Sequence, residues 1–502
     1  MIARYPIVAS LVFVSLLVAA TVQMARSFAA ALERPRLYDY FDEALAGLPV
    51  TIPAITWLAA AAPLDRPFEA NDAITIGLRL TEAWAAHANA LAIGVIDYLP
   101  DHFSGVALER ATLSVAEPGA RMVVLHQIAR PTFFHTDGSV MQVAAKALTV
   151  RFLLNDGQLG AFRITIDSTI TTLLNEAAGW RIFSYERQAA SELPPERVHV
   201  DVLRLRGINY YPANAPWSRF WPEFDRSAVA RDFALVRSLG GNVVRVFLHR
   251  SAFLDPAGAK RDIANLKALL DDADVAGLSV VPTLFDMRNG FEPGQWANDY
   301  LWLQNVLPVL AAAPNVAFVD LKNEPNLDYD SHGKGLVQAW LRTMAAVSRY
   351  IAPDLSLTIG WSNAASAGDL VDQVDIVSYH DFLAPEGTAD RVDDVRKVSQ
   401  GKPVYVTEVG ASSWSMALGL PNSLASQARA LKERLAGVAE ADGVFVWTLH
   451  DFPDPDAIAI GASPWRRGLQ SAFGLIAPDG SEKPAAAVVR AAFKALTRND
   501  PE

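Results

Sequence analysis

The chain contains no cysteine among its 502 residues, which excludes disulfide bonds, thiolate metal sites and a cysteine nucleophile. It also lacks an excess of positive charge, since 44 Lys and Arg stand against 55 Asp and Glu and the net charge is −11. Proteins that bind nucleic acids gain affinity by neutralising phosphates, so nucleic acid is not an expected partner. Internal repeats and low-complexity tracts are absent as well, which favours ordinary globular domains.

Long apolar runs are scarce, and the clearest one lies at the N-terminus. Residues 6–22 are almost entirely apolar, with Arg4 before the run and Arg26 after it. The run is at the short limit for crossing a bilayer and slightly long for the apolar part of a signal peptide. We therefore expect residues 1–30 to be a signal peptide or a membrane anchor. The protein would then be exported, either to the periplasmic face of a membrane or as a secreted protein.

A smaller α+β domain is predicted over residues 38–186. Residues 73–99 are rich in alanine and predict a helix, and four alternating segments predict an antiparallel sheet. Those segments are 121–134, 140–154, 160–173 and 180–185. Helices followed by a curved meander resemble the NTF2-like fold. The polar stretch 187–202, which contains Pro194 and Pro195, is typical of a linker.

The pattern changes after the linker to short apolar strands that alternate with amphipathic helices. This is typical of parallel β/α units, and strands buried on both faces form continuous apolar runs. Eight strands are expected, at 203–210, 242–248, 278–285, 316–321, 355–360, 374–379, 403–407 and 443–449. Eight units predict an α/β fold, a (β/α)8 TIM barrel over residues 203–497. A doubly wound open sheet is the alternative, but the glycine-rich phosphate loop that usually follows its first strand is missing.

Two carboxylates lie at the ends of predicted barrel strands, where active sites of such barrels form. Glu324 follows the fourth strand within Asn323-Glu324-Pro325, and Glu408 ends the seventh strand. A pair of carboxyl groups on one face suits the hydrolysis of glycosidic bonds. One group protonates the leaving oxygen, and the other attacks the sugar or activates water. The sequence therefore predicts Glu324 and Glu408 as the catalytic pair.

Several motifs together resemble the retaining glycoside hydrolases of clan A, closest to the cellulase-like family 5. They are Arg206-Gly207-Ile208-Asn209-Tyr210-Tyr211-Pro212, Gly241-Asn242-Val243-Val244-Arg245-Val246, Asn323-Glu324-Pro325, Ser378-Tyr379-His380, Glu408, Trp447, and the closing Phe473-Gly474-Leu475. The resemblance extends over residues 203–497, and the order of the motifs on successive strands makes it specific.

The resemblance implies roles for individual residues. Glu324 would be the acid/base and Glu408 the nucleophile, held ionised by Arg245. Asn323 would bind a sugar hydroxyl and Trp447 would form the floor of the sugar site. His380, Trp361, Asn209 and Tyr210 are also expected to contact the substrate. No metal or other cofactor is implied, and nothing in the sequence resembles a calcium-binding loop.

Two positions depart from the family pattern. Phe382 stands where the family often has a tyrosine that touches the nucleophile, and Asp286 stands where a histidine often follows the third strand. The expected function is nonetheless that of a retaining β-glycosidase that hydrolyses a β-linked polysaccharide or oligosaccharide. Two alternatives remain open: a transglycosylase that acts on a periplasmic or extracellular glucan, and a non-catalytic glycan-binding barrel.

Overall fold

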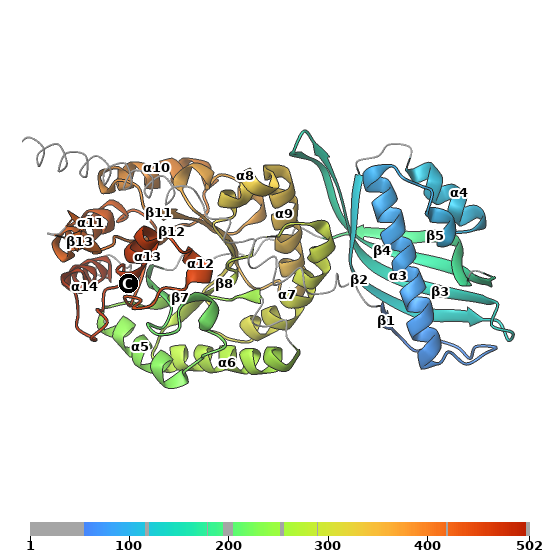
Figure 1. Ribbon diagram of the computed structural model, residues 1–502, viewed down its shortest axis with the longest axis horizontal. Coiled ribbons are helices and arrows are strands. Elements are labelled where there is room, and N and C mark those ends of the chain that lie inside the picture. Colours follow the sequence, from blue (N-terminus) through green and yellow to red (C-terminus); the bar gives the residue numbers. More distant parts are fainter. Residues whose placement is uncertain are drawn as a thin grey trace, which may run out of the picture.

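The computed structural model describes residues 55–115, 120–177, 179–193, 204–250, 256–288, 290–417 and 420–497. The expected signal peptide or membrane anchor at 1–30 lies outside these ranges. Within them, none of the helices has both the length and the apolar character that a membrane span needs. The described chain forms two lobes that lie side by side, an N-terminal sheet with two helices and a larger barrel (Figure 1).

The N-terminal lobe is a five-stranded sheet in the order β1-β2-β3-β4-β5. Its strands are β1 (Ile55–Trp57), β2 (Ala120–Phe134), β3 (Val140–Asn155), β4 (Gln158–Glu176) and β5 (Gly179–Glu192). Helices α3 (Ala70–Ile93) and α4 (Gly105–Ser114) pack on one face and bury Ile76, Leu80 and Phe103 against it (Figure 1). Helix α3 ends earlier than predicted, because Gly94 adopts the left-handed conformation that terminates helices.

The predicted linker is partly wrong. Strand β5 continues through residues 187–192, where Ala189 pairs with Ser168 and Glu192 with Thr165 of β4. The polar sequence of this stretch reflects an exposed strand, not a linker. Residues 194–203, which contain the rest of the predicted linker, lie outside the described ranges.

The second lobe confirms the predicted barrel. Its eight strands are parallel and close in the order β10-β11-β12-β15-β6-β7-β8-β9. They are β6 (Leu205–Tyr210), β7 (Val243–Phe247), β8 (Ser279–Phe285), β9 (Val319–Asn323), β10 (Leu357–Trp361), β11 (Val377–Asp381), β12 (Val404–Val409) and β15 (Gly443–Val446). The main surrounding helices are α5 (Arg226–Ser238), α6 (Pro256–Val275), α7 (Trp296–Ala311), α9 (Lys334–Ile351), α10 (Thr388–Val398), α11 (Leu424–Gly437) and α14 (Pro484–Thr497).

Barrel closure depends on a close approach between β6 and β15. Gly207 pairs with Phe445, and a β-carbon at Gly207 would meet Phe445 Cδ1 at 2.1 Å. Only glycine lets the aromatic ring lie over the neighbouring strand at this point. Strand β11 begins three residues later than predicted, so His380 lies inside the strand near its C-terminal end.

One hydrophobic cluster extends across both lobes. Phe152 of β3 stacks on Trp296 of α7 with ring centroids 5.2 Å apart, and His126 stacks on Tyr300 at 5.6 Å. The face of the sheet that α3 does not cover thus packs on the barrel, with Leu125 among the shared core residues. Continuous apolar packing of this kind favours a fixed arrangement of the lobes over independent motion.

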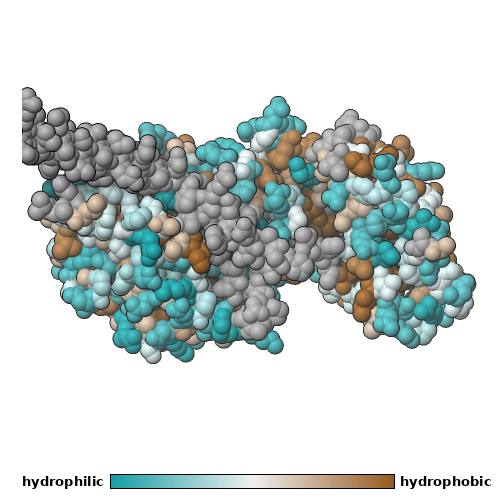
Figure 2. Space-filling model, viewed as in Figure 1, coloured by the Kyte–Doolittle hydropathy of each residue, from teal (hydrophilic) through white to brown (hydrophobic). Residues whose placement is uncertain are grey.

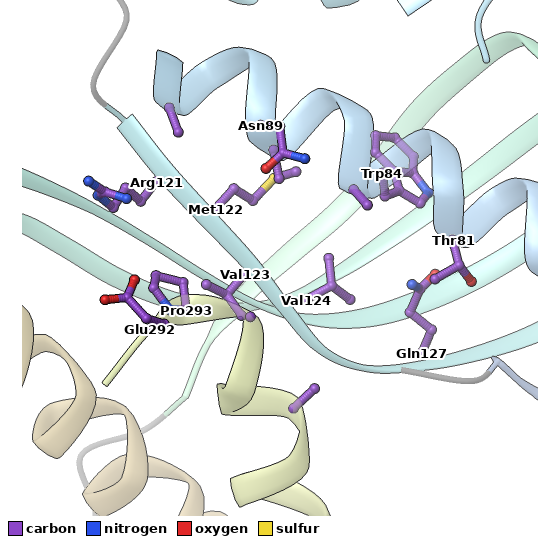
Figure 3. Close-up of a pocket in the computed structure, with 15 residues that line it drawn as sticks. Thr81, Trp84, Asn89, Arg121, Met122, Val123, Val124, Gln127, Glu292 and Pro293 are labelled. Atoms are coloured by element: carbon purple, nitrogen blue, oxygen red, sulfur yellow. The ribbon is translucent and has the colours of Figure 1, made fainter. Parts of the chain in front are cut away.

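A cavity of about 340 Å³ remains at the junction between the lobes (Figure 3). Trp84 and Asn89 of α3 line one side of it, Met122 and Gln127 of β2 line another, and the loop that begins α7 contributes Glu292 (Figure 3). Hydrophobic residues are visible near this junction, whereas the barrel face that is visible in Figure 2 is mostly hydrophilic.

Candidate active site

The two predicted carboxylates lie at the C-terminal mouth of the barrel and line one cavity of about 380 Å³. Glu408 belongs to β12, and its side chain is nearly buried. Glu324 follows β9 and has a left-handed backbone, with φ 48° and ψ 46°. Its amide donates to the carbonyl of Gly360 at 2.7 Å, which fixes this strained residue against β10. We call this space the carboxylate cavity.

Five of the thirteen residues that line the carboxylate cavity are aromatic. The lining residues are Trp217, Phe247, Asp286, Met287, Asn323, Glu324, Phe382, Glu408, Trp447, Ala459, Ile460, Gln470 and Phe473. Three of them, Trp217, Met287 and Glu324, have positive φ angles, an arrangement that costs energy and often marks functional sites. Sugars present apolar C–H faces that pack on aromatic rings, so this lining suits a carbohydrate.

Glu408 is held by a buried arginine. Nη1 of Arg245 donates to Oε1 of Glu408 at 2.7 Å and to Oδ1 of Asn209 at 2.9 Å. Nη2 donates to Asp320 at 2.7 Å and to Oδ1 of Asn323 at 2.9 Å. Arg245 is fully buried, so one guanidinium fixes four polar side chains at the mouth of the barrel.

Asp320 shares the arginine with Glu408. Its carboxylate also accepts from the hydroxyl of Thr283 at 2.9 Å and from the amide of Gly360 at 2.9 Å. A β-carbon at Gly360 would lie 3.0 Å from Asp320 and 3.3 Å from both Arg245 and His380. Glycine at this position therefore leaves the space in which the cluster assembles.

His380 lies between the two glutamates. Its Nδ1 is 2.9 Å from Oε1 of Glu324, and its Nε2 is 3.6 Å from Oε1 of Glu408. The ring of His380 is buried. His380 lies on β11, next to β12, the strand that carries Glu408. A single imidazole thus links the two carboxylates and limits the distance between them.

The two carboxyl groups differ in electrostatic environment. Burial raises the pKa of Glu408 above its ordinary value, and the charge of Glu324 adds to this, while His380 and Arg245 oppose it. Burial also raises the pKa of Glu324, but the hydrogen bond and charge of His380, with Arg245 and Lys322, outweigh it and leave this pKa below its ordinary value. The two groups interact, so they titrate as a pair.

Not every predicted substrate contact reaches the cavity. Asn209 is buried and donates through Nδ2 to the carbonyl of Thr407 at 2.9 Å, so it supports Arg245 from behind. Tyr210 points out of the barrel, and its hydroxyl donates to Asp232 at 2.8 Å. Trp361 is buried and does not line the cavity. Of the predicted substrate contacts, Asn209, Tyr210 and Trp361 thus do not line the carboxylate cavity.

The other tryptophans near the mouth of the barrel either line the carboxylate cavity or are buried in the core. Trp217 and Trp447 line the cavity with ring centroids 6.4 Å apart. Trp221 is buried and donates to the carbonyl of Phe247 at 2.9 Å, so it belongs to the core. The Trp447–Thr448 peptide bond is cis.

A further polar cluster at the cavity was not predicted as part of the site. Asp286 lines the cavity, accepts from the hydroxyl of Tyr211 at 2.8 Å, and lies 3.1 Å from Nε2 of His249. Burial raises the pKa of Asp286, but His249, Tyr211 and Lys322 outweigh it and lower this pKa below its ordinary value. The position of Asp286 at the end of β8 is the sequence signal that could have identified it.

Comparison with solved structures places the barrel among known folds. A GH5_18 protein from Streptomyces cattleya, solved in complex with GlcNAc, matches with a TM-score of 0.50 and 23% identity, over 60% of this chain and 82% of that chain. An exo-β-1,4-mannosidase from Opitutaceae bacterium strain TAV5 matches with a TM-score of 0.50 and 21% identity, over 58% of this chain and 59% of that chain. No protein-family model and no curated protein matches the sequence.

Proposed function

We infer that this chain is a glycoside hydrolase, because a GH5_18 protein and an exo-β-1,4-mannosidase are among the solved structures similar to it, and its own barrel has the eight parallel strands that the resemblance to clan A predicted. Identities of 21% and 23% establish this likeness at the level of the fold. Function has to be argued from the residues of the site. The NTF2-like character of the N-terminal lobe stays a prediction.

We propose that this chain is a retaining β-glycosidase that hydrolyses a β-linked glycan, with Glu408 as nucleophile and Glu324 as acid/base. The observation that carries the proposal is the joint contact of both glutamates with His380, at 2.9 Å and 3.6 Å. Retention of configuration is the part of the proposal taken from the resemblance to clan A, whose retaining members hold the two carboxyl groups about 5 to 5.5 Å apart.

In the first step, Glu408 attacks the anomeric carbon while Glu324 gives its proton to the leaving oxygen. This yields a covalent glycosyl-enzyme and a free alcohol. In the second step, Glu324 takes a proton from water, and the resulting hydroxide displaces Glu408 from the sugar. Two displacements at one carbon restore the original configuration. Arg245 orients Glu408 for the first attack.

The identity of the sugar is part of the proposal. One neighbour is an exo-β-1,4-mannosidase and another was solved with GlcNAc bound, so β-mannosides are the first substrates to examine. The apolar run at residues 6–22 supports action on a glycan outside the cytoplasm.

The test uses 4-nitrophenyl β-glycosides of mannose, glucose and GlcNAc. We expect Glu408→Ala to lose at least about 10⁴-fold in kcat, because no carboxylate remains to form the intermediate. Sodium azide should then restore turnover, since the small anion attacks from the vacated face and gives the glycosyl azide of inverted configuration. Glu440→Ala, which removes an exposed carboxylate far from the mouth, serves as the control. Full activity of Glu408→Ala without azide would refute the proposed role.

A further inference from the structure

The cavity of about 340 Å³ between the lobes, which we call the junction cavity, is separate from the carboxylate cavity, and none of its described lining residues belongs to both. Helix α3 forms one wall of the junction cavity, and the first half of β2 forms the wall opposite (Figure 3). The loop before α7 and the first turn of α7 close it from the barrel side. Both lobes therefore contribute to this space, and no step of the proposed hydrolysis uses it.

The junction cavity exists because α3 presents small side chains toward β2. Ala85, Ala88 and Ala92 lie at helical spacing on one side of α3, and all three line the cavity. Met122 and Val124 of β2 line it from the opposite wall. An apolar cavity of about 150 Å³ is large enough to hold benzene. The junction cavity is more than twice that size, so it has room for roughly two rings.

The aromatic part of the lining is fixed before any ligand binds. Trp84 of α3 lines the junction cavity. Its ring packs against Tyr185 and Phe103, with ring centroids 5.2 Å and 6.1 Å apart. A wall that is ordered in advance loses little entropy on binding, which favours affinity.

One buried polar side chain points into this apolar space. Gln127 is 4% exposed, and its backbone pairs with Ile55 of β1 and with Ala147 of β3, so its position is fixed. Figure 3 shows its amide at one end of the cavity, beside Thr81. Among the described residues, none forms a hydrogen bond with the side-chain amide of Gln127. The hydroxyl of Thr81 donates instead to the carbonyl of Gly77 at 2.8 Å. A buried amide without a partner is unfavourable, so a ligand that supplies one gains affinity.

The charged groups of the junction cavity lie at its other end. Arg121 and Gln127 are six residues apart along β2, and Figure 3 shows Arg121 and Glu292 at the end away from Gln127. These two are the charged members of the described lining, and their charges are opposite. An ion placed against Gln127 would lose its water without an opposite charge beside it. A neutral group that donates or accepts a hydrogen bond matches the amide, which can do both.

We propose that the junction cavity binds an uncharged, mainly apolar small molecule of about two rings that carries one hydrogen-bonding group. The rings pack between the alanines of α3 and the apolar side chains of β2, and the polar group meets the amide of Gln127. Because Glu292 and Ala297 belong to the barrel, a bound molecule contacts both lobes. The inference does not depend on the proposed glycosidase function, because the two cavities are separate.

The experiment titrates the full chain with 2-naphthol by isothermal titration calorimetry. 2-Naphthalenesulfonate has the same rings with an anionic group in place of the hydroxyl, and it serves as the comparison. We expect one molecule of 2-naphthol to bind per chain, at least about tenfold more tightly than the sulfonate. Binding to the folded state should also raise the melting temperature. Tighter binding of the sulfonate would overturn the uncharged class of ligand.

Two variants locate the binding. Ala88→Phe fills the junction cavity and should abolish binding of 2-naphthol. Gln127→Leu removes the amide and should weaken binding of 2-naphthol roughly fivefold. It should not weaken binding of 2-methylnaphthalene, which has the same rings without a hydroxyl and can be followed by its own fluorescence. A loss of both ligands in Gln127→Leu would contradict a hydrogen bond from the amide.

Leu78→Phe is the matched control, because Leu78 also lies on α3, is 53% exposed and does not line the junction cavity. It should keep the affinity of the unaltered protein, and circular dichroism should show that all three variants are folded. If the unaltered protein does not bind 2-naphthol, or if Ala88→Phe binds it equally well, the junction cavity is not the site. Should Ala88→Phe fail to fold, unchanged affinity for 2-naphthol in Gln127→Leu would overturn the proposal.

Discussion

Nη1 of Arg245 lies 2.7 Å from Oε1 of Glu408, and the same guanidinium lies 2.7 Å from Asp320 through Nη2. One buried cation therefore serves two carboxylates. Asp320 accepts two further hydrogen bonds, from Thr283 and Gly360, whereas Glu408 lines the carboxylate cavity. The arrangement orients Glu408 without fully neutralising it, which leaves a carboxylate that can still act as a nucleophile.

Replacing Arg245 should move the basic limb of the pH profile. The reactive form has Glu408 ionised and Glu324 protonated. Because the pKa of Glu408 is raised and that of Glu324 is lowered, this form is the minority one, and the basic limb of kcat/KM follows the pKa of Glu408. Arg245 opposes the rise in the pKa of Glu408, so Arg245→Gln should shift the basic limb to higher pH, with a loss of roughly 100-fold or more at the optimum. Arg245→Lys keeps the charge and should shift the limb less; an unmoved limb in both variants would contradict the role.

Replacing His380 should move both limbs of the pH profile. The hydrogen bond and charge of His380 help to hold the pKa of Glu324 below its ordinary value against the effect of burial, and its charge also opposes the rise in the pKa of Glu408. His380→Ala should therefore raise both pKa values and shift both limbs of kcat/KM to higher pH. The acidic limb, which follows the lower pKa of Glu324, should shift for substrates with poor leaving groups, because activated aryl glycosides need little protonation. Equal profiles with both kinds of substrate would exclude Glu324 as the acid.

Substrate binding should also change the acidic limb, which follows the lower pKa of Glu324 in the free protein. The side chain of Glu324 is 25% exposed and that of Glu408 only 9%, so a bound sugar removes more water from Glu324. Loss of water raises the pKa of a carboxyl group. The profile of kcat reports the bound enzyme and that of kcat/KM the free enzyme. We expect the acidic limb of kcat to lie at higher pH than that of kcat/KM; coincident limbs would count against this desolvation.

A close backbone contact between the two lobes should leave no room for a side chain at Gly335, so that adding one lowers the stability of the protein. The amide of Gly335, on α9, donates to the carbonyl of Gly157 in the β3–β4 turn at 2.9 Å, and an added β-carbon would meet that oxygen at 2.5 Å. Gly335→Ala should therefore lower the free energy of unfolding by about 1 to 3 kcal/mol, measured by thermal or urea unfolding. In Gly368→Ala the new β-carbon meets only Val398 at 3.4 Å, so this control should lose little. Equal free energies of unfolding for the two variants would mean that the β3–β4 hairpin moves away from the added methyl group without cost, and would contradict the prediction.

The barrel and its two glutamates could be predicted because parallel strands collect their C-terminal residues at one mouth. The side-chain directions were harder. Asn209 and Tyr210 are neighbours on β6, so they point to opposite sides, and only Asn209 reaches Arg245. The strand that replaces part of the predicted linker depends on pairing with β4, which its own polar sequence does not reveal. The sharing of Arg245 between Asp320 and Glu408 depends on the register of three strands, which no local pattern reveals.

The configuration of the first product tests the central claim most directly. Proton NMR of a β-glycoside in D₂O, recorded in the first minutes after adding the protein, shows whether the released sugar is the β- or the α-anomer before they equilibrate. Double displacement through Glu408 predicts the β-anomer first. Initial release of the α-anomer would contradict a covalent intermediate on Glu408.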